Sequence, residues 1–218
     1  MGEITAITPQ VKDKRRCNVY VDGRFCCGVT LEAAVKYRLK AGMTIDEARL
    51  DEIQSESEKN TALDKALTHI SACSKTEKDV REFLRKKGYL PSVEAYVVDK
   101  MREYGFIDDA AYAKAYARGA MKKKGRRLIA YELRGKGIAE ENIARAFLEL
   151  ETEREDSFCE GATSENDAAK MIAEKFMRGK EADEKTIAAL YRRLGSRGFD
   201  TDVVKETVAK YKRGNDEF

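Results

Sequence analysis

Apolar residues along most of this chain recur every three or four positions, which is the spacing of one face of a helix. Three such runs end alike, with a leucine, a basic residue, a glycine and an apolar residue in fixed order. They are LRKKGY (84–89), LRGKGI (133–138) and LGSRGF (194–199). Glycine adopts the left-handed conformation that often ends a helix at the least cost. The pattern therefore predicts helix stops at Gly88, Gly137 and Gly198.

An amphipathic helix precedes and follows each stop, and a further helix comes before each pair. These first helices begin near Thr61, Asp108 and Ser164. The unit is therefore three helices long, with glycine stops 49 and 61 positions apart and an insert near 151–165 in the longer interval. Such a period is typical of repeat proteins, in which neighbouring small units share a core or pack end to end.

The N-terminal segment has a different pattern. Asp22-Gly23 lies between two β-prone runs and is typical of a two-residue β-hairpin turn, and Ile4 to Thr8 predicts a third strand ended by Pro9. Helices are expected at 31–39 and 44–57, followed by a polar linker at 55–60.

The predicted fold class is mainly α. We expect an elongated tandem array of three three-helix repeats, preceded by a small N-terminal α+β module that contains the β-hairpin. The expected domains are residues 1–57, 58–107, 108–152 and 153–218.

Helix starts also have sequence signals. Ser74–Glu77 and Thr44–Glu47 have the spacing of a capping box, in which two side chains satisfy two free backbone N–H groups. The carboxylates of Asp108, Asp183 and Asp200 stand before helical runs and are predicted N-caps. Asp108-Asp109 is interpreted as a cap and not as a metal site, because no further ligand lies at suitable spacing.

Composition indicates a soluble, highly charged helical protein, with 37% charged residues and no tryptophan. No apolar run approaches the ~20 residues that span a bilayer, and no signal-peptide pattern opens the sequence. The five cysteines lack C-x-x-C spacing, which favours free thiols in a reducing cytoplasm. They are Cys17, Cys26, Cys27, Cys73 and Cys159.

The net charge is only +3, but it is unevenly placed. Residues 75–136 hold seventeen Lys and Arg against nine Asp and Glu, whereas residues 140–167 hold ten acids and two Arg. The cations at 75–87 spread around a helix and are predicted to be solvated. Lys87, Lys136 and Arg197 directly precede the glycine stops, where a cation suits the negative end of a helix dipole.

The steepest basic run lies at the predicted junction between two helices of the middle unit. Cations at a helix start oppose the helix dipole, so their presence indicates a role other than helix stability. The run predicts contact with phosphate or carboxylate groups, and a solvated charged turn is the alternative. The candidate partner-binding or nucleic-acid-binding residues are Lys122, Lys123, Lys124, Arg126, Arg127, Arg134 and Lys136.

Catalytic motifs are not found in the sequence. There is no phosphate-binding P-loop or dinucleotide fingerprint, and the one histidine, His69, lies in an apolar helical stretch that favours a structural role. The helical spacing of Tyr112, Tyr116, Tyr131 and Phe147 favours core positions over base-stacking platforms. We therefore expect no enzyme activity, no catalytic residue, no metal and no cofactor.

Three segments carry a resemblance to a known family. YGFIDDAAYA (104–113), KGRRL (124–128) and ELRGKGI (132–138) resemble the central signature of the RecX family, bacterial modulators of the RecA recombinase. The hairpin at 21–24 and the stretch at 37–43 resemble an additional N-terminal module of some Gram-positive members. The resemblance is strongest from Tyr104 to Ile138 and weakest in the acidic insert.

The resemblance implies an elongated, curved array of three-helix repeats that binds along the groove of the RecA–DNA filament. It further implies inhibition of strand exchange and of the coupled ATP hydrolysis, and hence a role in DNA repair, homologous recombination and the SOS response. It transfers no catalytic residue. The implied partner is the RecA filament, with DNA contacted directly or through it, and we expect a cytoplasmic monomer without a membrane association.

Two alternatives stay open. A helical DNA-binding module that acts without RecA would bind duplex DNA strongly by itself, which the low net charge and the acidic segment disfavour. A protein-only scaffold would bind its partner regardless of nucleic acid.

Overall fold

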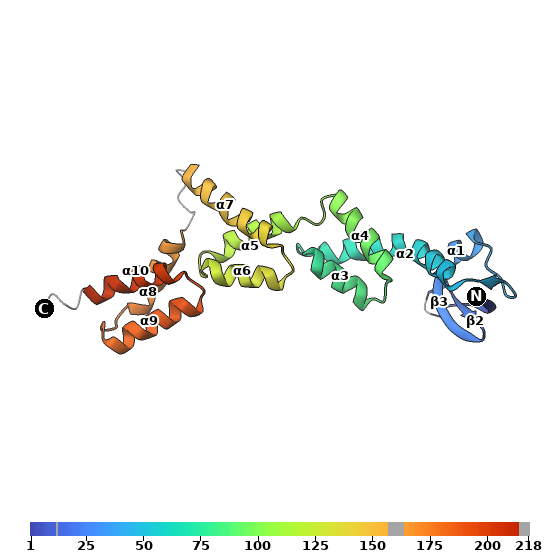
Figure 1. Ribbon diagram of the computed structural model, residues 1–218, viewed down its shortest axis with the longest axis horizontal. Helices are drawn as coiled ribbons and strands as arrows, with labels where there is room; N and C mark the ends of the chain where they lie inside the picture. Colours follow the sequence, from blue (N-terminus) through green and yellow to red (C-terminus); the bar gives the residue numbers. More distant parts are fainter. Residues whose placement is uncertain (12, 157–163, 214–218) are drawn as a thin grey trace. The chain divides into compact units, whose positions relative to one another are not determined.

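The computed structural model describes residues 1–11, 13–156 and 164–213. The chain divides into two compact units, Met1–Ile107 and Asp108–Phe218. The described residues are mainly helical, and the strands are confined to the N-terminal part of the first unit, as Figure 1 shows. This arrangement confirms the predicted mainly α fold class with its small N-terminal strand module.

The first unit begins with a four-stranded antiparallel sheet in the order β3-β2-β1-β4. Its strands are β1 (Gly2–Pro9), β2 (Arg16–Val21), β3 (Arg24–Thr30) and β4 (Thr44–Ile45). Asp22 and Gly23 have φ angles of 50° and 78°, as a type I′ turn requires at both central residues. The predicted hairpin is therefore confirmed. The predicted helix start at Thr44 is wrong, because Thr44 and Ile45 pair with β1.

A short helix, α1 (Leu31–Lys36), and a long one, α2 (Glu47–Ile70), follow the sheet. The N-terminal half of α2 packs Leu50 and Ile53 into the core of the sheet module. Its C-terminal half packs Ala62 and Ala66 into the core of the first three-helix repeat. A single helix thus belongs to two cores, and the predicted polar linker between two separate helices is wrong.

The polar residues at 55–60 are the reason that the sequence wrongly predicted a linker here. The Oγ atoms of Ser55 and Ser92 are 2.9 Å apart, and the Glu58 carboxylate accepts a hydrogen bond of 2.5 Å from the Arg16 guanidinium. Ser55 and Glu58 are only 7% and 5% exposed. Their polarity therefore serves buried contacts, and glutamate and lysine are good helix formers that let α2 continue.

The first repeat is completed by α3 (Glu77–Lys86) and α4 (Pro91–Glu103). Its capping box joins Thr76 and Asp79, whose side chains each accept a hydrogen bond from the other's backbone N–H. The predicted box at Ser74–Glu77 is therefore wrong by two positions. The box predicted at Thr44–Glu47 is also wrong, since Asp46 is the N-cap of α2.

The second unit contains the other two repeats. Their helices are α5 (Asp109–Ala120), α6 (Arg126–Gly135), α7 (Glu140–Asp156), α8 (Glu165–Met177), α9 (Glu184–Ser196) and α10 (Thr201–Arg213). The three predicted stops are confirmed, because Gly88, Gly137 and Gly198 have φ angles of 82°, 82° and 75°.

The aspartate caps of this unit are confirmed too. The Asp108 and Asp183 carboxylates accept hydrogen bonds from Ala111 N and Thr186 N at 2.9 and 2.8 Å. Asp200 accepts one from Asp202 N at 3.3 Å, directly before α10.

Each repeat of the second unit has its own core. Ile129 and Leu133 of α6 are fully buried in one cluster, and Leu190 and Leu194 of α9 in another. Tyr112, Tyr116 and Phe147 pack against the first of these cores. Tyr131 does not, since it is 71% exposed. Its predicted core position is wrong, because it lies on the face of α6 opposite Ile129 and Leu133.

The acidic insert is partly helical. Helix α7 continues to Asp156, and residues 157–163, with Cys159, lie outside the described part of the chain. The expected boundaries at 57/58 and 152/153 fall inside α2 and α7. As divisions between domains, all the boundaries stay predictions.

Four of the five cysteines lie in the first unit and have free thiols. Cys17 and Cys27 are buried, whereas Cys26 and Cys73 are exposed. Burial raises the pKa of the Cys27 thiol to about 12, so this thiol is protonated and unreactive at neutral pH.

Candidate anion-binding site at a repeat junction

The basic run forms the turn between α5 and α6, as its sequence predicted. The backbone N–H groups of Lys123 and Lys124 donate to Ala120 O at 2.9 Å, and Gly125 is the N-cap of α6. Gly125 has no side chain to accept a hydrogen bond from the first turn of α6. The free N–H groups of this helix must therefore find partners elsewhere.

The α9–α10 turn of the third repeat supplies some of these partners. Gly125 N donates to Arg197 O at 2.9 Å, and Arg127 N donates to Gly198 O at 3.1 Å. A Cβ atom on Gly125 would lie 2.3 Å from Phe199 N, and one on Gly198 would lie 2.3 Å from Leu128 N. Only glycine at both positions lets the two backbones approach so closely.

Glu165, the first residue of α8, supplies a further partner. Its Oε1 atom accepts hydrogen bonds from Arg126 N at 3.1 Å and from Asp200 N at 3.2 Å. The Glu165 side chain is only 13% exposed. One carboxylate thus bridges the start of α6 and the residue before α10, which fixes the second and third repeats against each other at this junction.

Three of the seven predicted binding cations are neutralised inside the repeat. Lys124 Nζ lies 2.5 Å from the Glu132 carboxylate, and this hydrogen bond raises the pKa of Lys124. Arg134 donates two hydrogen bonds to Glu140, at 2.7 and 2.8 Å. Arg126 pairs with Glu151. These side chains have a structural role that the sequence pattern did not indicate.

Three others remain uncompensated. Lys122, Lys123 and Arg127 are exposed. In the part of the chain that the structure describes, none of the three has a carboxylate within 4.0 Å. Lys136 lies apart from them, at the C-terminal end of α6, with its Nζ atom 5.5 Å from the centre of the Tyr112 ring.

The structure adds a cation that sequence reasoning missed. Arg197 is the C-cap of α9, as its position predicted, but its Nη1 atom also donates to Lys123 O at 3.4 Å. The two residues are 74 positions apart, so no local pattern indicates this contact. We call Lys122, Lys123, Arg127 and Arg197 the junction cluster.

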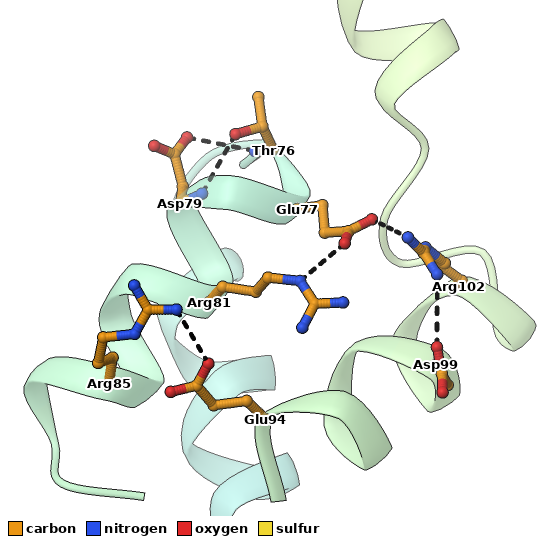
Figure 2. A network of polar contacts seen from close by, with 8 residues as sticks. All are labelled: Thr76, Glu77, Asp79, Arg81, Arg85, Glu94, Asp99 and Arg102. Atoms are coloured by element: carbon orange, nitrogen blue, oxygen red, sulfur yellow. Dashed lines mark hydrogen bonds and ion pairs between the residues drawn. The ribbon is translucent and has the colours of Figure 1, made fainter. Parts of the chain in front are cut away.

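Three arginines of the first repeat, drawn in Figure 2, are paired with carboxylates. Glu77 accepts hydrogen bonds from both Arg81 and Arg102, and the Arg85 guanidinium lies 3.4 Å from the Glu94 carboxylate. Burial raises the pKa of Glu77, but the two arginines outweigh it and leave this pKa below its ordinary value. Arg81, predicted to be solvated, is instead half-buried and paired, whereas Arg85 is 70% exposed, as predicted.

The remaining side chains with possible chemistry lie elsewhere. His69 stacks on Phe83 with ring centres 4.1 Å apart, which confirms its structural role. No group of three or more His, Cys, Asp or Glu among the described residues is placed to bind a metal ion. None of the helices in that part of the chain combines the length and apolar character that crossing a bilayer requires.

Comparisons with known proteins assign the chain. Residues 2–46 match the family model of the regulatory protein RecX N-terminal domain, and residues 108–146 match that of the RecX second three-helix domain. Regulatory protein RecX of Clostridium perfringens (strain 13 / Type A) is 31% identical over 214 residues, which cover 96% of each chain. The chain belongs to the RecX family.

Other RecX proteins agree with this assignment. Regulatory protein RecX of Bacillus subtilis (strain 168) is 28% identical over all of this chain and 80% of its own length. A crystal structure of regulatory protein RecX superimposes with a TM-score of 0.60 at 26% identity, covering 95% of this chain and 98% of that one. RecX from Lactobacillus salivarius has a TM-score of 0.61 at 21% identity and covers 72% of this chain, a likeness of fold. The family is a regulatory one by name.

Proposed function

We propose that this RecX-family chain binds the RecA–DNA filament and inhibits recombinase activity and the coupled ATP hydrolysis. It would thereby modulate DNA repair and recombination in the cytoplasm, as a docking protein without catalysis of its own. The observation that supports the proposal is the junction cluster, four cations at the contact between two repeats with no carboxylate partner among the described residues.

The physical basis is multivalent docking. A chain with several repeats presents several surfaces, and contacts that are individually weak combine through effective concentration. Uncompensated cations are attracted to DNA phosphates or to acidic protein surfaces, and they also speed the encounter. The paired cations of the first repeat contribute little to this attraction, because a neighbouring carboxylate already balances each of their charges.

The test is RecA-dependent ATP hydrolysis on single-stranded DNA, with and without this protein at substoichiometric amounts. We expect a clear drop in the rate, because one bound chain would contact more than one recombinase subunit. The protein alone, with ATP and DNA, should release no phosphate. An unchanged rate up to equimolar protein would contradict the proposal.

The same preparation separates the two alternatives. Strong duplex binding by the protein alone, with no effect on RecA, would favour a RecA-independent DNA-binding module. Partner binding that is insensitive to both DNA and salt would favour a protein-only scaffold.

A further inference from the structure

Tyr131 is the most exposed of the four aromatic side chains that the sequence placed in the core of the middle repeat. Tyr112 and Tyr116 stack on each other with ring centres 6.3 Å apart, and the Arg126 guanidinium covers the Phe147 ring at 5.2 Å. Tyr131 is 71% exposed, and no ring or cation among the described residues contacts it. A single exposed tyrosine is common on protein surfaces, but here it leaves a ring face open for stacking beside exposed arginines.

The neighbours of Tyr131 on the surface of α6 are arginines. Arg127 and Arg134 are four residues before and three residues after it, so the three side chains form one exposed stripe along the helix. At 1.5 Å per residue, Arg127 lies about 6 Å and Arg134 about 4.5 Å from Tyr131 along the axis. Arg134 is oriented by Glu140, whereas Arg127 belongs to the uncompensated junction cluster.

A groove of about 730 Å³ runs beside this stripe. Tyr131, Arg127 and Arg134 of α6 line one wall, and Gly195 and Ser196 at the end of α9 line another, together with Gly198 of the turn that follows. Small residues on that wall allow another backbone to approach closely. Among the arginines that line the groove, Arg126 and Arg134 are paired with carboxylates, whereas Arg127 has no carboxylate within 4.0 Å among the described residues. The uncompensated charge of Arg127 favours an anionic occupant.

We propose that this groove binds a single nucleic-acid strand, with Tyr131 stacking on a base and Arg127 contacting a phosphate. The inference rests on the proposed function, because it identifies the DNA of the filament as what this surface contacts. A positively charged groove with an exposed aromatic ring is the usual combination for unpaired strands, since every base has a face for stacking. Bases inside a duplex stack on each other and leave no such face for Tyr131.

The chain offers a direct probe, because it contains no tryptophan. Tyr131→Trp places a single indole at the stacking position, and Tyr191→Trp places one at an exposed tyrosine of α9 as the matched control. We expect a short oligothymidine, without RecA, to quench the fluorescence of the first variant and leave the second unchanged. Inorganic polyphosphate should quench neither, because it has no base.

Affinities measured by anisotropy of a labelled oligothymidine complete the test. Tyr131→Ala should weaken binding about tenfold, whereas Tyr131→Phe, which keeps the ring, should stay within about twofold of the unchanged protein. Tyr191→Ala should bind as the unchanged protein does.

Three results would overturn the inference. They are no quenching at Tyr131→Trp, unchanged binding by Tyr131→Ala, or equal quenching by polyglutamate, which would assign the groove to an acidic protein segment. Inhibition of RecA without strand binding would refute this inference and leave the proposed function intact. Strand binding without any effect on RecA would refute the proposed function and leave strand binding by this groove intact.

Discussion

Gly198→Ala is expected to separate the second and third repeats at their junction. The new Cβ atom would lie 2.3 Å from Leu128 N and 2.4 Å from Leu128 Cβ, and backbone cannot yield as a flexible side chain can. The residue also has a φ angle of 75°, which alanine tolerates poorly. Overpacking and backbone strain together should cost about 3 kcal/mol at this contact.

Amide hydrogen exchange measures how far this junction opens, at the backbone N–H groups that cross it. Gly125 N and Arg127 N donate to the α9–α10 turn, so their exchange should accelerate strongly in Gly198→Ala. Gly88→Ala is the matched control, because Gly88 occupies the same helix-stop position with a φ angle of 82° and open space around its Cβ. It should cost about 1 kcal/mol of backbone strain and leave both amides protected. Equal effects of the two substitutions would show that the junction contact has no energetic importance.

Arg16→Ala is expected to destabilise the first unit strongly. It removes the cation that faces Glu58, whose side chain is only 6% exposed. The remaining carboxylate would be buried without its partner, which should lower the free energy of unfolding by about 3 kcal/mol. Because Glu58 lies in the middle of α2, the loss should loosen the sheet module from the helix that continues into the first repeat.

Arg49→Ala is the control for this prediction. Arg49 pairs with Glu52 on the same helix, but their side chains are 56% and 66% exposed. An exposed pair of this kind contributes at most about 1 kcal/mol. Urea unfolding followed by a probe in the first unit should therefore shift much more for Arg16→Ala. The double variant Arg16→Met with Glu58→Leu should recover most of the loss, because it leaves no buried charge. Similar midpoints for Arg16→Ala and Arg49→Ala would contradict a buried ion pair.

The sequence correctly predicted the helix stops and the hairpin turn, because their conformations depend on one or two adjacent residues. A glycine after a basic residue marks each helix stop because the left-handed conformation is a property of that residue alone, as at Gly88 and Gly198. The Asp22-Gly23 turn is predictable for the same reason. The family resemblance from Tyr104 to Ile138 was enough to name the family, which the comparisons then confirmed.

The wrong predictions concern positions whose environment depends on residues far away in the sequence. Polarity at 55–60 resembled a linker because the partners of Ser55 and Glu58 lie 37 and 42 positions away. Helical spacing alone did not tell the exposed Tyr131 from the half-buried Tyr116, since the spacing fixes a face but not its neighbours. Arg197 joins the candidate site only through the folded junction. The cation run indicated the right place, but only folding shows which of its charges are already paired.

The junction cluster is the surface through which we propose that this RecX-family chain docks on the RecA filament. Inhibition of RecA ATP hydrolysis, measured across salt concentrations, tests this proposal most directly, with a variant that carries Lys122→Ala, Lys123→Ala and Arg127→Ala. The control carries Lys14→Ala, Arg15→Ala and Lys40→Ala, which remove three exposed cations of the N-terminal module and change the net charge equally.

We expect the junction variant to need about tenfold more protein for half-inhibition at low salt, with the salt slope reduced by about 2 to 3 units. The control should inhibit as the unchanged protein does. If the junction variant inhibits like the unchanged protein at every salt concentration, the junction cluster is not the docking surface.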